Sequence, residues 1–202
     1  MSETQRRVSK KELTYDDYVA TQKAAEEGNP DAICQIGFFY KFGLFVEKDE
    51  DEALKWFIQA GHLLNADAQW AAGDIYRYGT EKMPPNPMLA AKWLRYATHT
   101  EPNGRNLRCY GECIENGIGV MVDKAEAADF YSRAVEAGDR YAFYRLGRLY
   151  LLGDGVSQDV PKGLGYIYTA KMRGVEEASN YWAWLEAQGL LKGIQITEKE
   201  VD

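Results

Sequence analysis

Residues 142–170 read AFYRLGRLYLLGDGVSQDVPKGLGYIYTA, and this pattern of small, aromatic and turn-forming residues returns along most of the chain. Its central glycine, Gly147, has counterparts at steps of 36 to 38 residues, with a degenerate last copy at Ala183. The counterparts are Gly37, Gly73 and Gly111. A repeat of this length, made of helix-length segments, indicates a solenoid of stacked helix pairs. We therefore predict an all-α fold that leaves one long surface available to a partner.

Each repeat is expected to hold two helices, here called the first-type and the second-type helix. Small residues on one face of the first-type helix allow the second-type helix to pack closely against it. Glycines that readily adopt left-handed backbone end this helix, at Gly43, Gly79, Gly117 and Gly153. Capping side chains then begin the second-type helix, at Asp49, Asn86, Asp123 and Asp159. We expect it to end at Gly61, Gly138 and Gly174, and we expect Gly163 to mark close helix packing.

The same pattern predicts the organisation of the chain. A flexible N-terminus over residues 1–12 precedes a single solenoid over residues 13–189, and a tail follows over residues 190–202. Within the solenoid we expect a capping helix at 13–28, repeats at 29–62, 63–99, 103–136 and 139–173, and a terminal half-repeat at 175–189.

Composition excludes several classes of partner. The formal net charge of −7 disfavours nucleic acid and anionic membrane as main partners, because both require a basic face. No apolar run approaches the ~20 residues of a membrane span, and the N-terminal segment lacks the apolar core of a signal peptide. Three cysteines are too few for a disulfide framework, which favours a reducing compartment. We expect a cytoplasmic monomer.

The repeated string Ala-x4-Gly-x2-Tyr-x2-Gly, followed by a Gly-x-Gly-Val turn, Asp and Ala-x2-aromatic-x3-Ala, resembles the Sel-1-like repeat, a relative of the tetratricopeptide repeat. Residues 117–120 (GIGV) and 153–156 (GDGV) carry the turn most clearly. The first copy departs from it with Gly43-Leu44-Phe45-Val46, and the second has a longer loop over residues 80–85. The resemblance implies a right-handed α/α superhelix that supports protein–protein contacts, and it implies no catalytic activity.

Candidate catalytic, cofactor-binding and metal-binding residues are not found. His62 and His99 occupy equivalent positions near the ends of second-type helices, where the helix dipole favours them. Cys109 and Cys113 share one helix face, but a metal site needs about four ligands, so we interpret them as small apolar filler. The paired glycines of the turns follow helices, not strands, and lack the lysine of a phosphate-binding loop.

In the related tetratricopeptide fold the first-type helices line a concave groove. Applied here, positions −6, −3, +1, +4 and +5 from the central glycine give an arginine cluster flanked by aromatic residues. The predicted partner-binding residues are Phe38, Lys41, Trp70, Arg77, Tyr78, Arg105, Arg108, Tyr141, Tyr144, Arg148 and Trp184. Such a groove suits an acidic–hydrophobic peptide or C-terminal tail. In the alternative, some aromatics belong to the core and the arginines pair with Asp67, Asp74, Glu112 and Glu115.

Three classes of function are compatible with these features. The first is a scaffold or adaptor that binds a peptide or protein segment in the groove. The second is an inhibitor or immunity-type protein, whose acidic surface would bind and block a basic enzyme. The third, a hydrolytic enzyme that uses groove carboxylates, has no supporting pair of acidic residues in the sequence.

Overall fold

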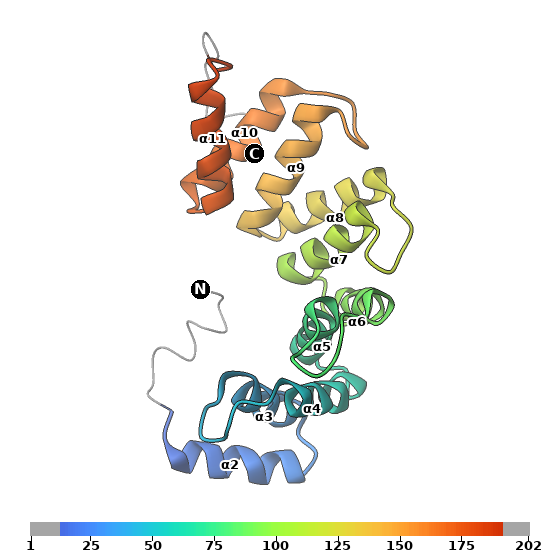
Figure 1. The fold of residues 1–202 in the computed structure, drawn as a ribbon, viewed down its shortest axis with the longest axis vertical. Coiled ribbons are helices and arrows are strands. Elements are labelled where there is room, and N and C mark those ends of the chain that lie inside the picture. Colours follow the sequence, from blue (N-terminus) through green and yellow to red (C-terminus); the bar gives the residue numbers. More distant parts are fainter. Residues whose placement is uncertain (1–12, 192–202) are drawn as a thin grey trace. The chain divides into compact units, whose positions relative to one another are not determined.

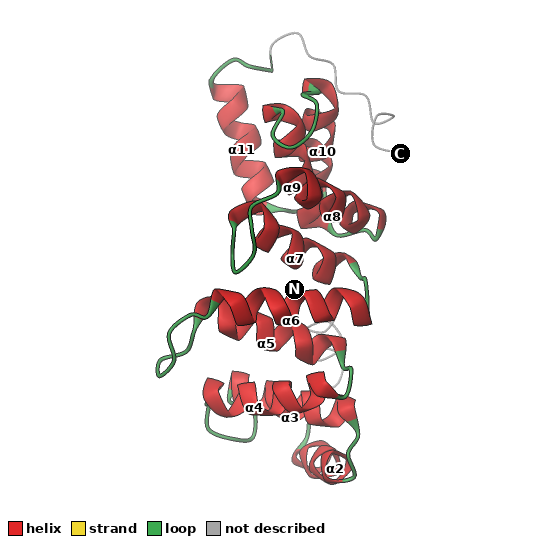
Figure 2. Cartoon of the chain, turned by 90° about the vertical axis from the view of Figure 1, so that its right-hand side faces the viewer, coloured by secondary structure: helices red, strands yellow, loops and turns green. Residues whose placement is uncertain are grey.

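The computed structural model describes residues 13–191, so the expectations for residues 1–12 and 192–202 lie outside the described part. Over this range the chain forms ten helices and no strand (Figure 2). None of the helices between residues 13 and 191 has both the length and the apolar content needed to cross a bilayer. The chain divides into two compact units, residues 1–100 and 101–202, and each is described by itself.

The first unit holds five helices (Figure 1). They are α2 (Tyr15–Glu26), α3 (Pro30–Phe42), α4 (Glu50–His62), α5 (Ala66–Tyr78) and α6 (Pro87–Thr100). The helices α3 and α5 are of the first type, and each packs most extensively on the second-type helix that follows it. Tyr18 of α2, Phe39 of α3 and Phe57 of α4 belong to one buried core. Each helix therefore buries one face against its sequence neighbours.

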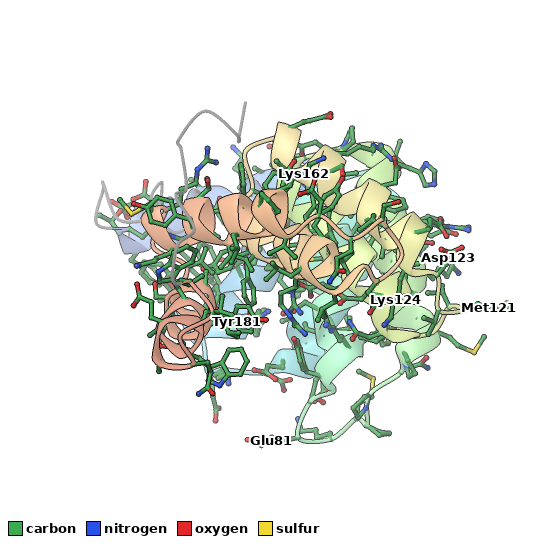
Figure 3. The ribbon with its side chains drawn as sticks, turned by 90° about the horizontal axis from the view of Figure 1, so that it is seen from above. Glu81, Met121, Asp123, Lys124, Lys162 and Tyr181 are labelled. Atoms are coloured by element: carbon green, nitrogen blue, oxygen red, sulfur yellow. The ribbon has the colours of Figure 1, made fainter. Side chains whose placement is uncertain are left out.

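The second unit repeats this arrangement. It contains α7 (Gly104–Asn116), α8 (Lys124–Glu136), α9 (Arg140–Leu152), α10 (Val160–Met172) and α11 (Glu176–Ala187). Its terminal core includes Phe143, Ile167 and Trp182, from α9, α10 and α11. Lys124 at the start of α8 (Figure 3) pairs with Asp154 in the loop after α9, which ties one repeat to the next.

The predicted helix caps are confirmed. The glycines that follow α3, α5, α7 and α9 all have positive φ, and they are Gly43, Gly79, Gly117 and Gly153. Asp49 accepts hydrogen bonds from the backbone N–H groups of Asp51 and Glu52 at 2.9 and 3.0 Å. The capping side chains at the starts of α6, α8 and α10 do the same, and they are Asn86, Asp123 and Asp159. These bonds satisfy N–H groups that have no partner within the helix.

The prediction that Gly61 ends α4 is wrong. Gly61 lies inside α4, and a Cβ there would sit 2.7 Å from the ring of Trp93, so the glycine serves close packing. The left-handed residue after α4 is Leu64, with φ of 61°. Gly138 and Gly174 hold the equivalent position after α8 and α10, as predicted. Leu64 therefore adopts the left-handed conformation that glycine adopts at the equivalent positions, Gly138 and Gly174.

Close approach of helices is clearest between α9 and α10. A Cβ on Gly147 would lie 2.8 Å from the carbonyl oxygen of Gly163, and a Cβ on Gly163 would lie 2.8 Å from that of Gly147. The two backbones thus meet without an intervening side chain, as the position of Gly163 predicts. At Gly37 the nearest neighbour is instead the ring of Phe57, at 2.6 Å from the same hypothetical atom.

Candidate protein-binding surface

The first-type helices of the first unit carry a row of aromatic and charged side chains. Phe38 and Phe42, one turn apart on α3, stack with their centroids 6.0 Å apart. Lys41 forms an ion pair of 3.1 Å with Asp74 of α5, and its ammonium lies 5.8 Å from the centroid of the Trp70 ring. The predicted residues Phe38, Lys41 and Trp70 are all half-buried, and this ion pair joins α3 to α5.

Arg77 and Tyr78 lie at the C-terminal end of α5. The Arg77 guanidinium carbon is 5.5 Å from the centroid of the Tyr78 ring, within the range of a cation–π interaction. The Tyr78 side chain is 69% exposed, so it leaves most of its area available for contact. The other predicted arginines belong to the second unit.

Arg108 is largely enclosed. Its guanidinium donates to Glu112 on its own helix at 2.8 Å and to Asp139 at 3.1 Å, and its side chain is only 16% exposed. Asp139 also caps α9 through the N–H groups of Tyr141 and Ala142. Arg108 thus joins α7 to the start of α9. The pair with Glu112 agrees with the alternative interpretation of the sequence, in which the arginines pair with nearby carboxylates instead of facing a partner.

Two further contacts extend this polar network. Arg145 of α9 lies 3.5 Å from the same Glu112 carboxylate. On α8, the Tyr131 hydroxyl donates to Glu115 of α7 at 2.6 Å. Burial, reinforced by the Glu115 carboxylate, raises the pKa of Tyr131, so the hydroxyl stays a donor at neutral pH. The network therefore fixes the relative positions of α7, α8 and α9.

Tyr141 and Arg105 border the network. The Tyr141 ring lies 5.3 Å from the guanidinium carbon of Arg108 and 4.8 Å from that of Arg140, which also donates to the Tyr141 hydroxyl. Arg105 is half-buried, and its Nε lies 3.4 Å from the side-chain oxygen of Asn106. Cations of this unit therefore gather along α7 and the first turn of α9.

A second group of side chains runs from α9 to α11, and we call it the aromatic strip: Arg148, Tyr144, Tyr181 and Trp184. The guanidinium of Arg148 lies 5.9 Å from the Tyr144 centroid. Tyr144 meets Tyr181 at 6.1 Å, and Tyr181, which projects from α11 (Figure 3), stacks on Trp184 at 5.6 Å. Trp184 is 50% exposed at one end of the strip.

Arg145 and Tyr181 were not among the predicted partner-binding residues. Tyr181 contacts two that were, Tyr144 and Trp184, and Arg145 contacts Glu112, which the alternative named. Both stand two residues before the central residue of their repeats, Gly147 and Ala183. Position −2 lies one helical turn after −6 and one turn before +1, so it shares their face. Helical spacing alone could have identified both residues.

The remaining candidate groups are arranged for packing. Cys109 and Cys113 are buried on α7, in keeping with their interpretation as apolar filler. His62 lies in the last turn of α4 and meets the Trp93 ring edge-on at 5.3 Å. Between residues 13 and 191, no group of three or more His, Cys, Asp or Glu side chains is arranged to hold a metal ion.

Comparison with known protein families gives one family match. The sequence model described as Sel1 repeat matches residues 30–63, 66–98, 110–139 and 141–175, which together make up more than half of the chain. An uncharacterized protein of Neisseria meningitidis serogroup B is 29% identical over 157 residues, or 62% of this chain. The chain spans only 33% of that relative's length.

Solved structures show the same fold. The crystal structure of a Sel1 repeat protein from Oxalobacter formigenes aligns with a TM-score of 0.78 at 28% identity, over 92% of this chain and 75% of that one. A protective antigen of uropathogenic Escherichia coli, described as displaying an SLR fold, aligns with a TM-score of 0.75 at 25% identity, over 92% and 39% of the two chains. These likenesses confirm the predicted all-α solenoid class.

Proposed function

The chain belongs to the Sel1 repeat family, and we propose that it is a scaffold that binds a segment of a partner protein on the surface of its first-type helices. The Sel1 repeat fold generally mediates protein–protein interaction, and proteins built from it are typically scaffolds without enzymatic activity. The partner, the binding surface and a cytoplasmic, monomeric state are parts of this proposal. The low cysteine count supports the reducing compartment.

The observation that carries the proposal is the exposure of large aromatic side chains on first-type helices of both units. Phe42 of α3, Tyr78 of α5 and Trp184 of α11 are each at least half exposed. Exposed aromatic area beside arginine or lysine is typical of the anchors that dominate protein interfaces. Tyr78 has such a cation beside it in Arg77.

The test is affinity capture from lysate with the full chain, followed by truncation of the captured partner. We expect a short segment of the partner to retain full binding. The combined Phe42→Ser and Trp184→Ser variant should lose it. A matched control, Met88→Ser with Met172→Ser, removes two apolar side chains that are even more exposed, from the second-type helices α6 and α10, and should bind normally.

Two outcomes would contradict the proposal. Loss of binding in the control but not in the first-type variant would move the binding surface to the second-type helices. A partner that binds only as an intact enzyme, and is inhibited by this chain, would instead support the inhibitor function.

A further inference from the structure

We propose that the aromatic strip of α9 and α11 binds an acidic segment of the partner, with a carboxylate held by Arg148 and an adjacent aromatic or aliphatic side chain packed on Trp184. This inference rests on the proposed scaffold function and specifies the chemistry of its partner. The strip is continuous, because Tyr144 and Tyr181 join Arg148 to Trp184 through ring contacts of 5.9, 6.1 and 5.6 Å.

Arg148 differs from the arginines near it in its ionic contacts. Arg108 is paired with Glu112 and Asp139, and Arg145 lies 3.5 Å from Glu112. Arg148, in contrast, makes no ion pair or hydrogen bond with any residue of the described range 13–191, and its guanidinium lies over the face of Tyr144. Its planar set of N–H donors thus lacks the carboxylate that it fits best.

The other polar side chains of the strip also carry a hydrogen-bond donor. Within the part of the chain that the structure describes, the hydroxyls of Tyr144 and Tyr181 and the indole Nε1 of Trp184 donate to no acceptor. Four side chains therefore present donors beside aromatic faces. A ligand that carries hydrogen-bond acceptors and an apolar group would fit both the donors and the aromatic faces. In a protein segment, a carboxylate next to an aromatic or aliphatic residue has this combination.

Charge favours a protein segment over nucleic acid as the source of the anion. Nucleic-acid binding requires several cations that neutralise successive phosphates, whereas the strip has one arginine and the chain carries a net charge of −7. A single guanidinium with aromatic neighbours suits one or two carboxylates of a short peptide segment.

The experiment is selection of a random dodecapeptide display library on the full-length protein. Selected peptides are synthesised, and their affinities are measured by fluorescence anisotropy with the wild type, Arg148→Gln and Arg133→Gln. Arg133 of α8 is the matched control, because it also lies over an aromatic ring, at 5.3 Å from Phe130, but on a second-type helix. A single-stranded thymidine oligonucleotide serves as the nucleic-acid probe.

We expect the selected peptides to carry Asp or Glu next to an aromatic or aliphatic residue. Arg148→Gln should weaken them about tenfold or more, as for the loss of a charge-assisted hydrogen bond, while Arg133→Gln leaves the affinity unchanged. Replacing the peptide's acidic residue by its amide should weaken binding to the wild type and have little further effect on Arg148→Gln.

Failure of this inference is distinguishable from failure of the scaffold function. Peptides that lack acidic residues, or that bind Arg148→Gln as tightly as the wild type, would overturn the carboxylate site and leave segment binding intact. Oligonucleotide binding that depends on Arg148 would overturn it in favour of a phosphate site. A selection that enriches no peptide would overturn both proposals.

Discussion

Replacing Arg108 by Gln tests whether this arginine holds the second unit together. The substitution removes the donors to Glu112, at 2.8 Å, and to Asp139, at 3.1 Å, from a site where the arginine and glutamate side chains are 16% and 8% exposed. It also removes the guanidinium from the face of Tyr141. The change leaves two carboxylates close together without the cation that they share.

The magnitude follows from what remains after the substitution. Removing one partner of a buried ion pair costs about 3–5 kcal/mol, because the other charge stays buried. Here Glu112 keeps Arg145 at 3.5 Å, and Asp139 still accepts from two backbone N–H groups of α9. We therefore expect a loss of about 2–3 kcal/mol in the free energy of unfolding, which is at or just below the lower end of that range.

The assay is urea denaturation followed by far-ultraviolet circular dichroism, combined with hydrogen exchange of the α7 and α9 amides to locate the loss. Arg148→Gln is the matched control, and its stability should change by less than about 0.5 kcal/mol, as for a surface substitution. An Arg108→Gln variant as stable as the wild type, with unchanged exchange in α7 and α9, would refute the role assigned to this network.

Four further predictions concern the repeat itself. Leu64→Gly should raise the free energy of unfolding by about 1 kcal/mol in urea denaturation, because it relieves a left-handed leucine that is 71% exposed. Phe45→Gly, at the other left-handed side chain, should instead lower it by about 1 kcal/mol, since that ring packs on aromatic residues of α2 and α3. Gly147→Ala should lower the melting temperature, with a cost of about 1–3 kcal/mol, although alanine is the better helix former; a rise would show that α9 and α10 can separate. Hydrogen bonds, first that from the N–H of Glu52, lower the pKa of the Asp49 carboxyl. The ionised Asp49 carboxylate therefore stabilises the fold above the ordinary Asp pKa of about 4, and this stabilisation is lost as the pH falls through the lowered pKa. Melting temperature should fall less steeply in Asp49→Asn than in the wild type between about pH 5 and about pH 3.

Most of the fold could be predicted from the chain because the signals are local. Glycines with positive φ and capping Asp or Asn residues act within one turn of their own helix, and the repeat multiplies each signal. The prediction that Gly61 ends α4 was wrong because it, too, relied on a local signal. Gly61 leaves room for the ring of Trp93. Trp93 belongs to the next repeat, so no pattern local to Gly61 identifies this contact.

The candidate surface was harder to predict from the sequence. Whether an arginine forms an ion pair depends on carboxylates that are distant in the chain. Arg108 and Arg148 occupy comparable predicted positions, yet Arg108 meets Asp139, 31 residues away. Arg148 has no carboxylate partner among residues 13–191 and lies over the Tyr144 ring. The aromatic strip, in contrast, could have been completed from helical spacing, which assigns Tyr181 to the same face.

Site-specific photo-crosslinking shows directly whether the first-type helices bind the partner. A photoreactive amino acid is introduced in turn at Phe42 and Trp184 on first-type helices, and at the exposed Lys55 and Asp129 on the second-type helices α4 and α8. Each variant is irradiated in native lysate. We expect one crosslinked partner from Phe42, Trp184 or both, and none from Lys55 or Asp129. The same partner crosslinked only from Lys55 or Asp129 would contradict it.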